Sequence, residues 1–134
     1  MQYLLDTNTC IELIRKRSQR VLSKLTSHAI SDIVLSTITI AELQYGVQKS
    51  RFVVQNQQAL NQFLIPFQYL DFDDSAAQAY GIIRAHLESQ GTPIGSLDML
   101  LAAQAIAHSL ILVTNNVKEF QRIPNLQIED WTKR

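Results

Sequence analysis

Short apolar segments of strand length alternate along this chain with longer segments whose apolar residues recur at helical spacing. Strands are expected at residues 2–5, 33–35, 68–72, 110–113 and 126–129. Helices are expected at residues 10–16, 18–28, 40–49, 52–65, 73–90 and 97–108. Because strands that alternate with helices form βαβ units, we predict an α/β fold. It would be a single three-layer domain over residues 1–134, with a central, mainly parallel β-sheet flanked by helices.

Several helix ends carry capping signals. Thr9 with Glu12, and Thr39 with Glu42, have the spacing of a capping box, which predicts that a helix begins just after each threonine. Gly91 is expected to follow the end of a long helix, where glycine adopts the left-handed conformation at little cost.

Composition and charge exclude several classes of protein. Hydrophobic residues make up 46% and charged residues 18%, as in a globular domain, and no apolar run approaches the roughly 18–20 residues of a membrane span. The first residues do not resemble a signal peptide, and Cys10 is the single cysteine, so we expect a cytoplasmic protein without disulfides. The formal net charge of zero neither favours nor excludes nucleic acid. The basic block of Arg15, Lys16, Arg17 and Arg20 is a candidate to bind RNA phosphates, although a solvated helix end explains it equally well.

Three carboxylates from distant segments are expected at one edge of the predicted sheet. Asp6 follows the first strand, while Glu42 and Asp98 each lie in the first turn of a later helix. Ligands of open parallel sheets bind at the carboxyl ends of the strands. Carboxylates that share a pocket need a counter-ion to remain ionised, and oxygen ligands without a His or Cys cluster suit Mg²⁺ or Mn²⁺. Such a site can activate water for attack on a phosphodiester.

Four motifs, in order along the chain, resemble PIN-domain nucleases and, among these, the VapC toxins of bacterial toxin–antitoxin pairs. The motifs are YLLDTNTCIELI (3–14), LSTITIAELQYGV (35–47), PIGSLDMLLAAQA (93–105) and LVTNNVKEFQRIPNLQIEDW (112–131). The resemblance implies an Mg²⁺- or Mn²⁺-dependent endoribonuclease with Asp6, Glu42 and Asp98 as catalytic residues. Asp6 and Asp98 would bind the metal. Asn8 and Thr114 match polar positions that orient ligands or water.

This sequence departs from the family pattern at one position, and the resemblance also implies a substrate and partners. Many PIN domains carry a fourth acidic residue where this chain has the amide Asn116, and Glu119 is the candidate to replace it. One metal ion is therefore expected rather than two. The implied substrate is structured RNA, often tRNA. The implied partners are a VapB-like antitoxin, operator DNA bound only through that antitoxin, and a second copy of the chain in a homodimer.

Two other classes of function stay open at this stage. The segment Asp6–Thr9 is similar to the start of haloacid-dehalogenase-like phosphatases, but Asn8 stands where these need a second aspartate. A receiver domain would need a phosphoacceptor at the end of a central strand, with Asp71 as the candidate. The remaining alternative is a nuclease fold that has lost catalysis and only binds RNA or protein, which Asn116 keeps open.

Overall fold

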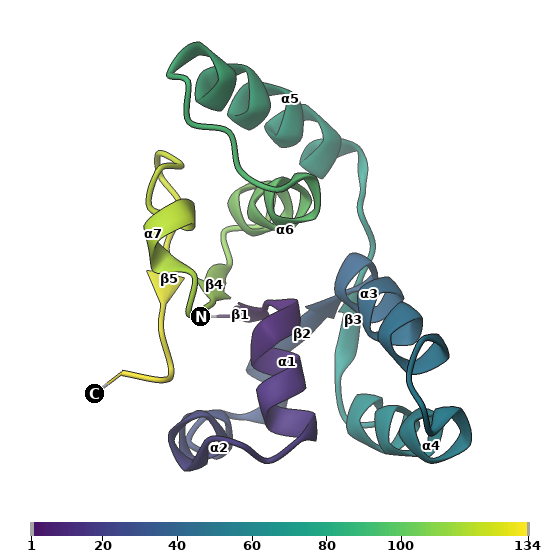
Figure 1. Ribbon diagram of the computed structural model, residues 1–134. Coiled ribbons are helices and arrows are strands. Elements are labelled where there is room, and N and C mark those ends of the chain that lie inside the picture. Colours follow the sequence, from purple (N-terminus) through teal and green to yellow (C-terminus); the bar gives the residue numbers. More distant parts are fainter. Residues whose placement is uncertain (1, 134) are drawn as a thin grey trace.

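A parallel five-stranded sheet forms the centre of the computed structural model, which describes residues 2–133 (Figure 1). The strands are β1 (Tyr3–Leu5), β2 (Ile33–Ser36), β3 (Gln68–Leu70), β4 (Ile111–Val113) and β5 (Ile128–Glu129). The helices are α1 (Thr7–Ile14), α2 (Gln19–Thr26), α3 (Thr37–Gln48), α4 (Val53–Leu64), α5 (Asp74–Ser89), α6 (Ser96–Ala107) and α7 (Val117–Phe120), with a 3₁₀ turn at Ile30–Asp32. The predicted α/β fold is confirmed, and every strand pair is parallel.

Each face of the sheet is covered by its own hydrophobic core, because alternate side chains of a strand point to opposite faces. Leu4 and Leu112 belong to a core shared with α5 and α6. Leu5 and Val113 belong to a second core shared with the helices α1 to α4. Figure 1 shows α5 and α6 stacked on one side of the sheet, with α1 and α2 on the other. The sheet and the helical layer on each of its faces are the three predicted layers. Cys10 is fully buried in the second core, as a structural cysteine would be.

The strand order places a reversal point beside the central strand. The sheet has the order β3-β2-β1-β4-β5, so the chain first builds outward from β1 on one side and then returns to its other side with β4. Ligands of open parallel sheets bind where the order reverses, outside the carboxyl ends of the strands. α1 and α3 follow β1 and β2 and therefore begin at this edge, and α6, which leads into β4, begins there as well.

The two predicted capping boxes are wrong, because both helices begin directly where the preceding strand ends. Asp6 caps α1, and its Oδ1 accepts a hydrogen bond from the backbone N–H of Thr9 at 2.8 Å. Ser36 caps α3, and its Oγ accepts from the N–H of Ile38 at 3.0 Å. Thr9 lies inside α1 and donates its hydroxyl proton to the carbonyl of Val113 at 3.2 Å. The capping residue is thus the last residue of the strand in β2, and the residue directly after the strand in β1.

Other helix ends agree with the sequence. Gly91 follows α5 with a φ of 68°, the left-handed conformation expected at a C-terminal cap. The short helix α7 and the 3₁₀ turn before β2 were not predicted, since segments of three or four residues are too short to show periodicity. Within residues 2–133, none of the helices has both the length and the apolar character that crossing a membrane requires.

Candidate active site

Four carboxylates meet at the carboxyl edge of the sheet, around Asp98. This residue lies in the first turn of α6, and its pKa is raised to about 6, first by burial and then by the negative charges of Asp6, Glu119 and Glu42. Charges that raise the pKa of a carboxyl group in this way lie near it. The predicted set of Asp6, Glu42 and Asp98 is therefore brought together, and Glu119 joins it.

Asp6 is the most enclosed of these acids, with 4% of its surface exposed. Burial raises the pKa of Asp6, and hydrogen bonds from Thr114 and Thr9 partly oppose this by stabilising the ionised form. The predicted role of Thr114 in orienting a ligand thus has a structural counterpart: it bonds to the Asp6 carboxylate. Asp130, which we did not single out from the sequence, adds a further negative charge that raises the Asp6 pKa.

Glu42 is held by a threonine from another helix. It lies in α3, and its Oε1 accepts a hydrogen bond from the Oγ1 of Thr7 at 2.8 Å. Thr7 is the first residue of α1 and directly follows Asp6. The sequence analysis missed Thr7, because no local pattern shows that α1 and α3 lie side by side at their N-terminal ends.

Glu119 is held in a similar way by Asn116. The Nδ2 of Asn116 donates to the Oε2 of Glu119 at 3.1 Å, and the backbone N–H of Asn116 donates to the Oγ1 of Thr114 at 3.0 Å. A chain of hydrogen bonds therefore runs from Glu119 through Asn116 and Thr114 to Asp6. The amide at position 116 carries no charge itself, but it positions a neighbouring residue that does.

The donor set suits a hard divalent cation. No three Asp, Glu, His or Cys side chains within residues 2–133 are arranged to hold a metal ion by themselves. Mg²⁺ does not require such a cage, because it usually keeps several waters and binds one or two carboxylates together with substrate phosphates. Burial, together with the charges of neighbouring acids, raises the pKa of Asp6 and of Asp98, and a bound cation would favour the ionised form of both.

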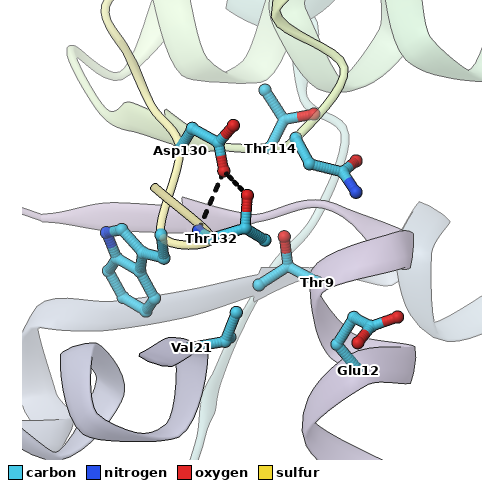
Figure 2. A pocket seen from close by; sticks show the side chains of 8 residues that line it. Thr9, Glu12, Val21, Thr114, Asp130 and Thr132 are labelled. Atoms are coloured by element: carbon cyan, nitrogen blue, oxygen red, sulfur yellow. Dashed lines mark hydrogen bonds between the residues drawn. The ribbon is translucent and has the colours of Figure 1, made fainter. Parts of the chain in front are cut away.

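A small cavity lies between α1, the end of β4 and the C-terminal segment, and Thr9, Thr114 and Asp130 are among its lining residues (Figure 2). Its volume of about 10 Å³ leaves room for one water molecule and is too small for a nucleotide. Figure 2 shows the carboxylate of Asp130 accepting hydrogen bonds from the N–H and the hydroxyl of Thr132, while Thr9 and Glu12 approach from α1. None of the four carboxylates around Asp98 lines this cavity, so it does not extend the substrate site.

A larger groove lies on the other side of Glu42, between α1, α3 and α4. Its volume is about 470 Å³. Its lining combines apolar, polar and basic side chains, namely Thr7, Asn8, Ile11, Ile14, Arg15, Glu42, Leu43, Tyr45, Gly46, Val47, Lys49, Ser50, Asn56, Ala59 and Leu60. Asn8, predicted to orient ligands or water, is exposed and lines this groove beside Glu42. The groove and the carboxylate site thus share Glu42.

The side chains of the predicted basic block have different neighbours. Arg15, Lys16, Arg17 and Arg20 are all exposed. Arg15 lines the groove. Arg17 lies 3.9 Å from the Glu12 carboxylate, and Arg20 donates to the carbonyl of Thr132 at 3.4 Å. Only Arg15 therefore lies beside the carboxylate site in a position that the structure defines.

Comparison with known proteins connects this site to a family. The sequence profile of the PIN domain matches residues 3–126. Ribonuclease VapC2 of Rickettsia felis is 46% identical over 134 residues, covering 99% of this chain and 100% of that protein. The tRNA(fMet)-specific endonuclease VapC of Salmonella typhimurium is 39% identical over 131 residues, covering 98% of each chain.

Solved structures agree with the sequence comparison. The fold matches VapBC from Salmonella typhimurium bound to DNA, with a TM-score of 0.92 and 39% identity over 98% of each chain. It also matches VapBC2 from Rickettsia felis bound to a promoter DNA fragment, with a TM-score of 0.89 and 44% identity over 98% of this chain and 99% of that one. A chain with these matches over almost its whole length is a PIN domain. It belongs to the VapC ribonucleases within that family.

Membership of this family removes the two phosphotransfer alternatives. Asp71, the candidate phosphoacceptor of a receiver domain, follows β3, which is the edge strand of the sheet and not a central one. The segment Asp6–Thr9 starts a helix of a PIN domain and not a phosphatase motif.

Proposed function

We propose that this protein is the toxin of a toxin–antitoxin pair and cleaves RNA as a divalent-metal-dependent endoribonuclease. The proposed cofactor is Mg²⁺ or Mn²⁺, and the proposed substrate is a structured RNA, with tRNA as the first candidate. The convergence of Asp6, Glu42, Asp98 and Glu119 on one edge of the sheet carries this proposal. Relatives named as ribonucleases and as a tRNA(fMet)-specific endonuclease support the choice of substrate.

Each acid has a distinct part in the proposed reaction. Asp6 and Asp98 would hold the cation directly, since they are the acids whose pKa is raised and whose charge a cation would stabilise. When bound, the cation would supply an activated water and neutralise charge on the phosphodiester. Glu42 would bind the metal or orient the attacking water, and Glu119 would complete the acidic rim. Thr114 keeps Asp6 in place through its hydrogen bond.

The proposed protein partner is a VapB-like antitoxin, and the groove beside Glu42 is the surface we assign to it. Apolar side chains from α1, α3 and α4 line the groove, including Ile11, Leu43 and Leu60. Arg15 and Lys49 add positive charge to the same lining. This combination suits an amphipathic segment of a protein that lays its apolar face into a groove. Because Glu42 lines the groove too, an occupant would approach the carboxylates and obstruct RNA.

Two further partners complete the proposal. Operator DNA would be bound through the antitoxin, in keeping with solved VapBC complexes that contain DNA. A homodimer is also proposed, and exposed apolar side chains beside the open edge strand β3 support it. Ile65 is 73% exposed and Tyr69 is 54% exposed. Sedimentation of the free protein, with Ile65→Glu as the comparison, tests whether this edge joins two copies.

RNA cleavage by the purified protein tests the enzymatic part of the proposal. The substrates are total bacterial RNA and transcribed initiator tRNA, each incubated with Mg²⁺, with Mn²⁺ and with EDTA. We expect discrete fragments that require the metal and that disappear in Asp6→Asn and Asp98→Asn. Asp71→Asn is the matched control, since Asp71 is an exposed aspartate outside the site, and it should cleave like the wild type.

The same experiment separates an enzyme from a binding module. A protein that has lost catalysis would bind the RNA, cut none of it under any metal condition, and show no difference between the wild type and Asp6→Asn. Growth arrest on expression without antitoxin, relieved by Asp6→Asn, is the corresponding result expected in cells.

A further inference from the structure

The first residue of α1 connects two acids of the site. Thr7 directly follows Asp6 in the sequence, and its Oγ1 donates a hydrogen bond to Oε1 of Glu42 in α3 at 2.8 Å. The distance is that of an ordinary, well-formed hydroxyl hydrogen bond. A shift of the N-terminus of α1 would therefore move both Asp6 and the partner of Glu42.

A second threonine contacts Thr7, and the carboxylate of Glu42 decides which hydroxyl donates in each contact. The Oγ1 of Thr39 lies 3.3 Å from the Oγ1 of Thr7, and Thr39 is fully buried. A hydroxyl has one proton to donate. Because an ionised Glu42 only accepts, the proton of Thr7 goes to Glu42, and Thr39 must donate to Thr7. Thr39 also lies one turn before Glu42 on α3, so both residues are on the face of α3 that meets Thr7.

We propose that Thr7 is a positioning residue that holds Glu42 in the orientation needed for the reaction. This inference rests on the proposed nuclease function. With Oε1 occupied by Thr7, the Glu42 side chain is restrained beside Asp98, whose pKa it helps to raise. The Oε2 of Glu42 makes no hydrogen bond within the described part of the chain and remains for the cation or its water. Without Thr7, the long and flexible glutamate would sample several rotamers and lose this geometry.

The alternative is that the hydrogen bond only joins two helices. Packing already does this, since Ile11 of α1 and Leu43 and Val47 of α3 belong to the same hydrophobic core. A single hydrogen bond adds little to net stability when both partners can reach solvent. The loss of Thr7 should therefore alter the site much more than it alters folding.

Three variants separate these two roles. Thr7→Val keeps the shape of the side chain and removes the donor, whereas Thr7→Ser keeps the donor. Thr37→Val is the matched control, because Thr37 is also a half-buried first residue of a helix and its side chain makes no hydrogen bond within residues 2–133. Each protein is assayed for kcat and KM on transcribed initiator tRNA, for Mn²⁺ affinity by calorimetry, and for unfolding in guanidinium chloride.

We expect Thr7→Val to lower kcat by about 10–100-fold and to weaken Mn²⁺ binding by about tenfold, the range typical of residues that orient metal-site ligands. KM should stay within about twofold, since Thr7 acts on the reaction through Glu42. Thr7→Ser should restore both values, and Thr37→Val should resemble the wild type. In a Glu42→Ala background, Thr7→Val should have no further effect, because either change alone already removes the shared hydrogen bond.

Two results would overturn the inference. One is a Thr7→Val protein with wild-type kcat and Mn²⁺ affinity. The other is a loss of activity that matches a loss of folded protein and that Thr7→Ser does not restore. Failure of the proposed function looks different: the wild type itself would cut no RNA, and the Mn²⁺ affinities would still decide whether Thr7 positions Glu42.

Discussion

The carboxylates of Asp6 and Asp98 come from segments far apart in the sequence and repel each other at the carboxyl edge of the sheet. Asp6 is the first of the three charges that add to burial in raising the pKa of Asp98 from 3.8 to about 6. Burial also raises the pKa of Asp6 itself. In the absence of a cation, this site therefore binds protons more tightly when the protein is folded than when it is unfolded.

This repulsion predicts how the stability of the metal-free protein depends on pH. Between about pH 4 and pH 6 the folded state carries more protons on Asp98 than the unfolded state, so the free energy of unfolding falls as the pH rises. Asp98→Asn removes this contribution and should be more stable than the wild type at pH 7, with little difference at pH 4. Guanidinium unfolding in EDTA at several pH values measures the effect. A wild type that gains stability relative to Asp98→Asn as the pH rises would contradict it.

A divalent cation should restore the stability that the mutual repulsion of these carboxylates removes at neutral pH. Mg²⁺ or Mn²⁺ binds only the folded site, so the melting temperature of the wild type should rise with metal concentration. Asp98→Asn and Asp6→Asn should show a much smaller rise, and Asp71→Asn should behave like the wild type. Differential scanning calorimetry with Mg²⁺, with Mn²⁺ and with EDTA measures this. An equal rise in all four proteins would show that the cation acts elsewhere on the chain.

The hydrogen bond between Asn116 and Glu119 predicts a graded effect on cleavage. Asn116→Ala frees Glu119 from its partner and should lower kcat by about tenfold, the smaller end of the range for ligand-orienting residues. Glu119→Gln should have a similar effect, and the double variant should be no worse than either single one. RNA cleavage rates at saturating Mg²⁺ provide the measurement. Additive losses would mean that Asn116 and Glu119 contribute separately.

The sequence was sufficient to predict the fold and to predict that Asp6, Glu42 and Asp98 lie near one another. Asp6 could be placed because it follows a short apolar strand, and Asp98 because it opens a helix that leads into another strand. Both arguments use the rule that strand ends share an edge in a parallel sheet. The predicted α/β order follows from the same alternation of strands and helices.

The contacts between elements could not be derived in this way. Thr7 and Thr39 lie on different helices, and their meeting depends on how α1 packs on α3, which no local pattern encodes. The capping boxes at Thr9 and Thr39 failed for a related reason. The spacing matched a capping box, but each helix begins three residues earlier than predicted, directly where the preceding strand ends. The individual contacts of the basic block were also beyond the sequence: Arg17 lies near Glu12, and Arg20 donates to the carbonyl of Thr132.

The groove beside Glu42 predicts that antitoxin binding can be removed without loss of nuclease activity. Ala59 of α4 lines the groove and is exposed, so Ala59→Glu places a charge among the apolar side chains with little effect on folding. The variant should cleave RNA like the wild type, because the carboxylate site is unchanged, but it should no longer be inhibited by or co-purify with its VapB-like antitoxin. Ala77→Glu is the matched control, since Ala77 is an exposed alanine of α5 outside the groove, and it should remain inhibited. Inhibition of Ala59→Glu at the wild-type antitoxin concentration would assign the antitoxin to another surface.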